Sequence, residues 1–456
     1  MNKKVIALWL LLCMVWTVPA AKGEFDTIAG WDEQVFPSYL ISTAAMKHTA
    51  EEDESTLGDG LGAFGVELVA TEDNQSIKVT IVCDGFAEPS EFVGTLSQSG
   101  ETYRVFPKMR YKFEKLSQYR QATPSSVTYR VQLGESEPEE KTVTITMRSI
   151  NDCAFMLLDG DNVIDMNFCF AAYVNEQHPF VDKLLREALD IGIVDSFTGY
   201  QSNDPDRVIA QVYAIWDLMA NRDVRYSSIT ATAALSRNTR SQHVRLLEET
   251  INNTQANCVD GTVLFASILR KIGIDSALVV TKDHCYLAFW ADNKHERLYG
   301  LETTMMCVDT ADVEVPDFYD TAVPEELRWD YSWGSFVHAM ATGTGNLQKE
   351  INKKDAEVTL IDVAVARLNG VLPIPFHSSE EFVAYDFSVS VEEDTEDAYE
   401  MDAEMGTEEE YADDGDSVSE DMESTGGIAS EEAVEWEDET PKQRRSRIKN
   451  ATVEWE

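Results

Sequence analysis

Basic residues are scarce in this sequence. It contains 37 Lys and Arg against 82 Asp and Glu, which gives a formal net charge of −45 over 456 residues. Proteins that bind nucleic acids or anionic membranes contact the phosphates mainly through Lys and Arg. The composition therefore argues against nucleic acid and anionic membrane as partners.

The shortage is greatest towards the C-terminus. Residues 391–440 contain no Lys or Arg and carry about half of the net negative charge. A segment so rich in Asp and Glu buries too little apolar surface to offset the entropy that is lost on ordering. We therefore expect residues 386–456 to form a disordered acidic tail. The tail is predicted to be a spacer that keeps the protein in solution, and contact with a basic partner is the alternative.

Long hydrophobic runs are lacking beyond the N-terminus. Residues 5–18 are mostly apolar, follow Lys3 and Lys4, and precede Pro19-Ala20-Ala21, where small residues stand at the expected cleavage site. This pattern is typical of a secretory signal peptide and is short for a membrane span. We expect a signal peptide at residues 1–21 and an exported protein, periplasmic or secreted to the cell envelope, with no integral membrane span.

The sequence also has neither a Cys-x-x-Cys pair nor a His-x-x-x-His pair. Pairs of this kind usually nucleate a zinc site, so we expect no metal and no cofactor. Seven cysteines are present, one of them in the predicted signal peptide. Export would allow disulfides among the other six, but their pairing cannot be derived from the sequence.

A length of 456 residues fits about two domains of ordinary size, and a hydrophobic content of 43% is ample for their cores. Four segments between residues 63 and 158 alternate or run apolar and are separated by polar turns, which predicts short strands. They are residues 66–70, 76–82, 126–133 and 141–147. We expect a β-sandwich-like N-terminal domain at residues 24–174.

The pattern changes after residue 175. Apolar residues at helical spacing predict helices over 180–189 and 206–218, with two more that begin near residues 245 and 258. Strands are predicted over 276–281, 284–290 and 297–303, and an amphipathic segment over 355–368. Helices that precede antiparallel strands predict an α+β domain at residues 175–385.

Three side chains in this second domain have types that serve nucleophilic catalysis. Cys258 is predicted at the start of a helix, where unpaired N–H groups and the helix dipole favour a thiolate. His284 begins one predicted strand and Glu302 ends the next, so antiparallel pairing would bring the imidazole and the carboxylate together. A buried cysteine, a turn histidine and a capping glutamate in chance order are the alternative interpretation. The three could also ligate zinc, which we rank below catalysis.

Residues 244–304 resemble the transglutaminase-like branch of the papain-like cysteine superfamily, and in particular its bacterial cell-envelope members. The similarity lies in Cys258-Val259-Asp260-Gly261, in Ile268-Leu269-Arg270-Lys271-Ile272-Gly273-Ile274, in His284-Cys285-Tyr286, and in Glu302-Thr303-Thr304. The resemblance implies a Cys258 nucleophile, a His284 base and a Glu302 that orients the base. It is loose over residues 180–376.

This resemblance implies a cysteine hydrolase or acyltransferase that acts on an amide in a peptide, a protein or a peptidoglycan-type substrate. No Trp flanks Cys258, which argues against crosslinking of glutamine to lysine. Gln255 is a candidate oxyanion donor, and the backbone N–H of Cys258 is another. The alternative to an enzyme is a catalytically inactive envelope protein that uses the fold to bind protein or glycan.

Overall fold

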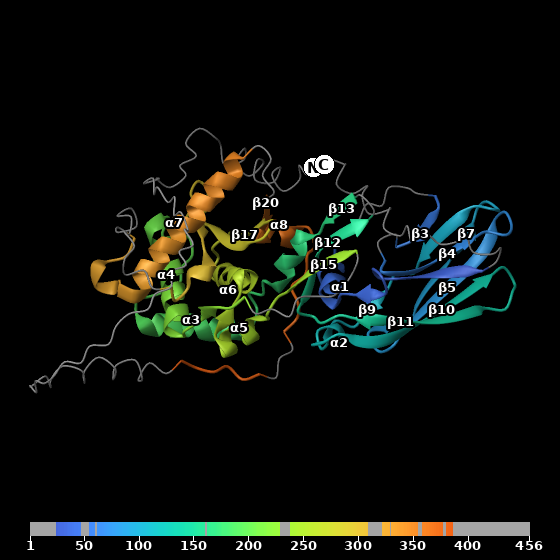
Figure 1. Cartoon of the computed structure of the whole chain (residues 1–456), viewed down its shortest axis with the longest axis horizontal. Coiled ribbons are helices and arrows are strands. Elements are labelled where there is room, and N and C mark those ends of the chain that lie inside the picture. Colours follow the sequence, from blue (N-terminus) through green and yellow to red (C-terminus); the bar gives the residue numbers. More distant parts are fainter. Residues whose placement is uncertain are drawn as a thin grey trace, which may run out of the picture.

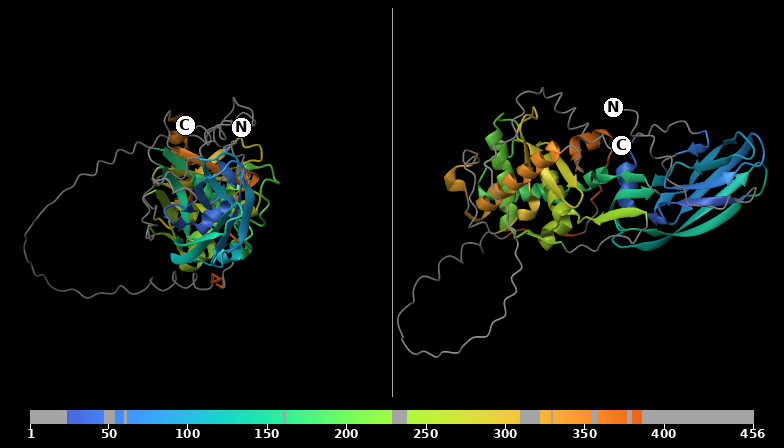
Figure 2. Two further views of the ribbon diagram at one scale, coloured as in Figure 1. Left: turned by 90° about the vertical axis from the view of Figure 1, so that its right-hand side faces the viewer. Right: turned by 45° about the horizontal axis from the view of Figure 1, so that its top comes forward.

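The structure, a computed structural model, describes residues 24–46, 54–59, 62–159, 162–228, 238–308, 322–328, 330–353, 358–376 and 380–385. The predicted signal peptide at residues 1–21 and the predicted acidic tail at residues 386–456 lie outside these ranges. The described part is an α+β protein, as the sequence predicts. Its β-rich part lies at one end of the molecule and its helical part at the other (Figure 1 and the right panel of Figure 2).

Two sheets form most of the β-rich part. The first has the strand order β1-β4-β8-β3 and the second the order β2-β11-β10-β5-β7. The four strands predicted from the sequence are β4, β5, β10 and β11. Alternate residues of β5 are buried, and the apolar faces of both sheets contribute to one hydrophobic core. The bounds are β1 Phe25–Ala29, β2 Gln34–Val35, β3 Thr56–Gly58, β4 Phe64–Val69, β5 Gln75–Cys83, β7 Ser90–Leu96, β8 Thr102–Phe106, β10 Thr123–Leu133 and β11 Glu139–Met147.

A small sheet joins the two parts of the chain. Strand β12 (Asp152–Asp159) pairs with β13 (Asn162–Asp165) on one side and with β15 (Thr239–His243) on the other. Because β15 comes from the second half of the chain, the halves share a sheet as well as a core. The short elements around this region are β6 Ala87–Glu88, β9 Arg110–Tyr111, α1 Pro37–Thr43, α2 Phe113–Leu116 and η2 Asn167–Tyr173.

The four predicted helices of the second part are present. They are α3 (Pro179–Ile191), α4 (Pro205–Asn221), α5 (Leu247–Asn253) and α6 (Cys258–Lys271). Helix α6 begins after its N-cap residue Asn257, and Gly273 follows its end with a φ of 81°. Glycine is suited to that left-handed conformation because it has no Cβ.

An antiparallel sheet of order β19-β18-β17-β20 packs between helices. One face of β18 contributes Cys285, Leu287 and Phe289 to the main core, while Tyr286 and Trp290 on the other face lie in a second apolar cluster that includes Leu347. This alternation is the ordinary consequence of strand geometry. The strands are β17 Ser276–Thr281, β18 Cys285–Trp290, β19 Leu298–Leu301 and β20 Val358–Asp362, and η3 (Thr303–Met305) follows β19.

Two elements differ from the sequence-based expectation. Within the amphipathic segment over 355–368, the described residues form strand β20 and the short helix α8 (Val363–Leu368), because Asp362 caps a new helix by accepting a hydrogen bond from the N–H of Val365. The long helix α7 (Asp330–Asn352) was not predicted. None of the helices in the described ranges is long and apolar enough to cross a membrane.

Candidate active site

Cys258 is the first residue of α6. The side-chain oxygen of Asn257 accepts hydrogen bonds from the N–H groups of Val259 and Asp260, each at 2.9 Å. The N-terminal turn is therefore held by a side-chain cap, and the partial positive charge of the helix end lies beside the thiol. Cys258 is partly exposed, so a reagent can reach it. The predicted position at a helix start is thus the observed one.

His284 and Glu302 meet where two neighbouring strands of the sheet begin and end. His284 immediately precedes β18, and Glu302 follows β19, its antiparallel neighbour. The Nε2 atom of His284 lies 2.7 Å from Oε2 of Glu302. The Glu302 side chain is only 6% exposed, whereas that of His284 is 36% exposed. The imidazole therefore bridges a buried carboxylate and the solvent-accessible site.

The second oxygen of Glu302 is also engaged. Its Oε1 atom accepts hydrogen bonds from the Thr304 backbone N–H at 3.2 Å and from the Thr304 hydroxyl at 2.6 Å. A buried carboxylate is tolerated where its oxygens are paired in this way. Thr304 thus fixes the orientation of Glu302, which in turn orients His284.

The imidazole also forms a hydrogen bond with the Cys258 side chain. This bond and the bond to Glu302 raise the pKa of His284 from 6.5 to about 10, while burial acts in the opposite direction. Two acceptors that become negative stabilise the imidazolium form. The structure therefore brings Cys258, His284 and Glu302 together, with the histidine between the thiol and the carboxylate.

Such an arrangement can support chemistry at a carbonyl carbon. A thiolate is the reactive form of cysteine, and an adjacent imidazolium can donate a proton to a leaving group. A carboxylate on the far side of the imidazole holds the ring and stabilises its charge. The roles that the sequence assigns to the three residues are compatible with this geometry.

Sequence reasoning did not single out Tyr226. This residue lies on β14 (Arg225–Tyr226), which pairs in parallel with β16 (Gln255–Ala256), so that Tyr226 is opposite Ala256. It is 48% exposed. Partial burial, and then the charges of Cys258 and Glu302, raise the pKa of its phenol. Tyr226 is therefore a neighbour of the site. The pairing of β14 with β16 brings it there.

The other candidate residues are placed as follows. Gln255 lies on β16 and is exposed, and its role as an oxyanion donor stays a prediction. Cys285 is buried and hydrogen-bonded to Thr262 in α6, and burial followed by the charge of Cys258 raises the pKa of its thiol well above the usual range. The six cysteines in the described ranges form no disulfide, and no cluster of three or more potential metal ligands occurs there.

In comparisons with known proteins, no family model matches the sequence and no curated protein matches it. The transglutaminase-like family therefore stays a prediction, carried by the residues around Cys258, His284 and Glu302.

Proposed function

We propose that this chain is a transglutaminase-like cysteine hydrolase or acyltransferase that acts on an amide bond. The observation that carries the proposal is the position of His284, which bonds the Cys258 thiol on one side and the Glu302 carboxylate at 2.7 Å on the other. The helix N-terminus beside Cys258 adds to the argument.

In the proposed reaction the Cys258 thiolate attacks the carbonyl carbon of the amide. The C–N bond breaks, His284 gives its proton to the leaving amine, and the acyl group remains on sulfur as a thioester. Water, with neutral His284 as the base, or a second amine then attacks the thioester. The carboxylic acid or the new amide leaves, and the thiolate and imidazolium are restored.

The substrate class that we propose is a peptide, a protein side chain or a peptidoglycan-type stem. The thiol is partly exposed at the start of α6, so a peptide-like substrate can reach it. Export to the periplasm or beyond, which the N-terminal sequence predicts, would give access to such substrates. A catalytically inactive envelope protein that binds protein or glycan is the second candidate, because this kind of fold supports both.

Alkylation of the thiol with iodoacetamide, followed against pH, tests the proposal. We expect Cys258 to be modified at pH 6–7, and mass spectrometry to locate the label there. Cys307 is the other partly exposed cysteine, so a Cys307→Ser variant is the matched control and should keep the fast reaction. His284→Ala should slow the reaction at pH 6–7, because the thiol loses the imidazole beside it.

The class of substrate is tested separately with fluorogenic peptide amides and with stem peptides. Turnover that is lost in Cys258→Ser supports an amide-directed enzyme. A Cys258 thiol that reacts no faster at pH 6–7 than a free cysteine would contradict the enzyme proposal and favour the binding alternative.

A further inference from the structure

One short segment connects the β-rich part with the helix that carries Cys258. It consists of residues 243–249, which run from the end of β15 into α5, and we call it the bridge segment. Asn151, a buried residue of the loop before β12, holds one side of it: its backbone O accepts from the N–H of Val244 at 2.7 Å, and its Nδ2 donates to the carbonyl of Val244 at 2.9 Å. The bridge segment is therefore bonded to the β-rich part through its backbone.

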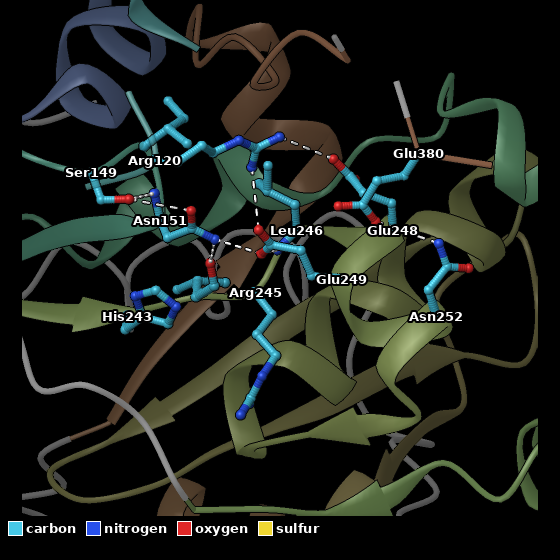
Figure 3. Close-up of polar contacts among 12 residues, drawn as sticks. Arg120, Ser149, Asn151, His243, Arg245, Leu246, Glu248, Glu249, Asn252 and Glu380 are labelled. Atoms are coloured by element: carbon cyan, nitrogen blue, oxygen red, sulfur yellow. Dashed lines mark hydrogen bonds and ion pairs between the residues drawn. The ribbon is translucent and has the colours of Figure 1, made fainter. Parts of the chain in front are cut away.

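Glu249 strengthens this attachment. Its Oε2 atom accepts hydrogen bonds from Nδ2 of Asn151 at 2.7 Å and from the N–H of Leu246 at 2.8 Å. Arg120, from the loop that precedes β10, pairs with Glu249 at 3.3 Å and with Glu248 at 3.4 Å. Figure 3 shows contacts from Arg120 to both glutamates and from Glu249 on to Asn151, with the Arg245 side chain directed away from this group.

The other side of the bridge segment holds the start of α6. The Asp260 carboxylate accepts from the backbone N–H of Arg245 at 2.8 Å, from Nη1 of Arg245 at 2.7 Å and from the N–H of Asn257 at 2.9 Å. Asp260 is fully buried, at 0% exposure. A buried carboxylate depends on such partners, because loss of one leaves an uncompensated charge. Asp260 thus fixes the backbone on both sides of Cys258 relative to Arg245.

We propose that Asp260 and the bridge segment are positioning elements that hold Cys258 against His284, so that the β-rich part contributes to the reactivity of the thiol without touching it. This inference rests on the proposed function. The physical reason is that a thiol and an imidazole must keep hydrogen-bond distance for proton exchange, and a shift of about 1 Å can cost about a hundredfold in rate.

Asp260→Asn tests the contacts between the bridge segment and the start of α6. The substitution keeps the shape but turns one acceptor into a donor, which then faces the N–H groups of Asn257 and Arg245. We expect alkylation of Cys258 at pH 6–7 to slow by about tenfold or more. The imidazole of His284, followed by NMR with His284→Gln for assignment, should titrate closer to its ordinary pKa than the wild-type value of about 10. A purely structural role would lower the Tm and leave this titration unchanged.

Glu249→Gln and Arg120→Met test the contacts between the bridge segment and the β-rich part. Arg120 pairs with the largely buried Glu248 and Glu249 of the bridge segment. Arg130, also an arginine of the β-rich part, forms an exposed pair with Glu140 away from the bridge segment, so Arg130→Met is the control. We expect Glu249→Gln to slow alkylation about fivefold and Arg120→Met about twofold, since the Arg120 side chain is itself exposed and solvent weakens its pairs. Arg130→Met should have no effect on the rate.

The outcomes separate the inference from the proposed function. A wild-type His284 that titrates near its ordinary value overturns both, because no thiol–imidazole pair would exist to be positioned. A raised wild-type value that persists in Asp260→Asn overturns the positioning role alone. If Asp260→Asn does not fold, Arg245→Met, which keeps the backbone bond to Asp260, gives the same comparison. If Glu249→Gln and Arg120→Met alkylate as fast as Arg130→Met, the β-rich part does not contribute to the reactivity of the Cys258 thiol.

Discussion

At the scale of single residues, the contacts with Cys258 and then with Glu302 raise the pKa of the His284 imidazole. Glu302→Gln removes the negative charge but keeps an acceptor, so the pKa of His284 should fall from about 10 towards its ordinary 6.5. The charged form of His284 stabilises the folded state fully below pH 6.5, and this contribution is lost as the pH rises towards 10. The Tm difference between wild type and variant should therefore be largest near pH 6 and shrink up to pH 10. A Tm difference that is independent of pH would contradict this account.

The residues of the candidate site differ in how far the sequence reveals them. Cys258, His284 and Glu302 could be singled out because each stands at the end of a predicted helix or strand and because the residues around them resemble a known family; the structure places them together. Tyr226 could not be found in this way. Its approach depends on the pairing of two-residue strands far apart in the chain, and so short a strand has no periodic pattern.

At the scale of elements, the packing of helix α7 on α4 makes the stability of the folded state depend on pH. Asp217 of α4 is buried, accepts a hydrogen bond from the Ser332 hydroxyl, and has a pKa that burial raises from 3.8 to about 6. The folded state therefore keeps a proton that the unfolded state releases, and stability falls as the pH rises from about 4 to 6. The loss amounts to about 3 kcal/mol at most.

Asp217→Asn tests this contribution, because the amide cannot ionise. The variant should show a flatter free energy of unfolding between pH 4 and 6 than the wild type, as measured by urea denaturation. Asp204 is the matched control, since it is an exposed aspartate at the start of the same helix and Asn is also a good N-cap residue. Equal slopes for wild type and Asp217→Asn would show that Asp217 does not carry the effect.

Helix α7 is an element that could not be predicted from the sequence. Its middle contains Thr342, Gly343, Thr344 and Gly345, which are weak helix formers. The structure gives the reason for Gly343: a Cβ added there would lie 2.6 Å from the carbonyl carbon of Gly300 in β19. Close approach of helix and strand requires glycine at that place, and the sequence pattern alone does not contain this tertiary contact. Helix α6, by contrast, has a cap, an apolar face and a terminal glycine, and its start at Cys258 was predicted.

At the scale of the whole molecule, residues 380–385 attach the end of the described chain to α3, to α5 and to the C-terminal end of α4. Arg222 donates to the carbonyl of Val383 at 2.6 Å, and Glu187 accepts from the N–H of Tyr385 at 3.0 Å. The Phe382 ring packs edge-on against Phe180 with centroids 5.0 Å apart. The predicted acidic tail follows directly, so this segment is where the described structure ends.

Limited proteolysis of Phe382→Ala tests how this segment is anchored. In the wild type we expect early loss of the tail and a resistant fragment that ends near Tyr385, which still contains both parts of the molecule because they share a sheet and a core. Loss of the Phe382 ring removes its contacts with Phe180 and with the cation of Arg222, and the cleavage site should move towards residue 376. Val383→Ala is the control, because that side chain is exposed and only its backbone is bound. An unchanged fragment in Phe382→Ala would mean that the backbone bonds to Arg222 and Glu187 suffice to hold the segment, and the aromatic contact would then be dispensable.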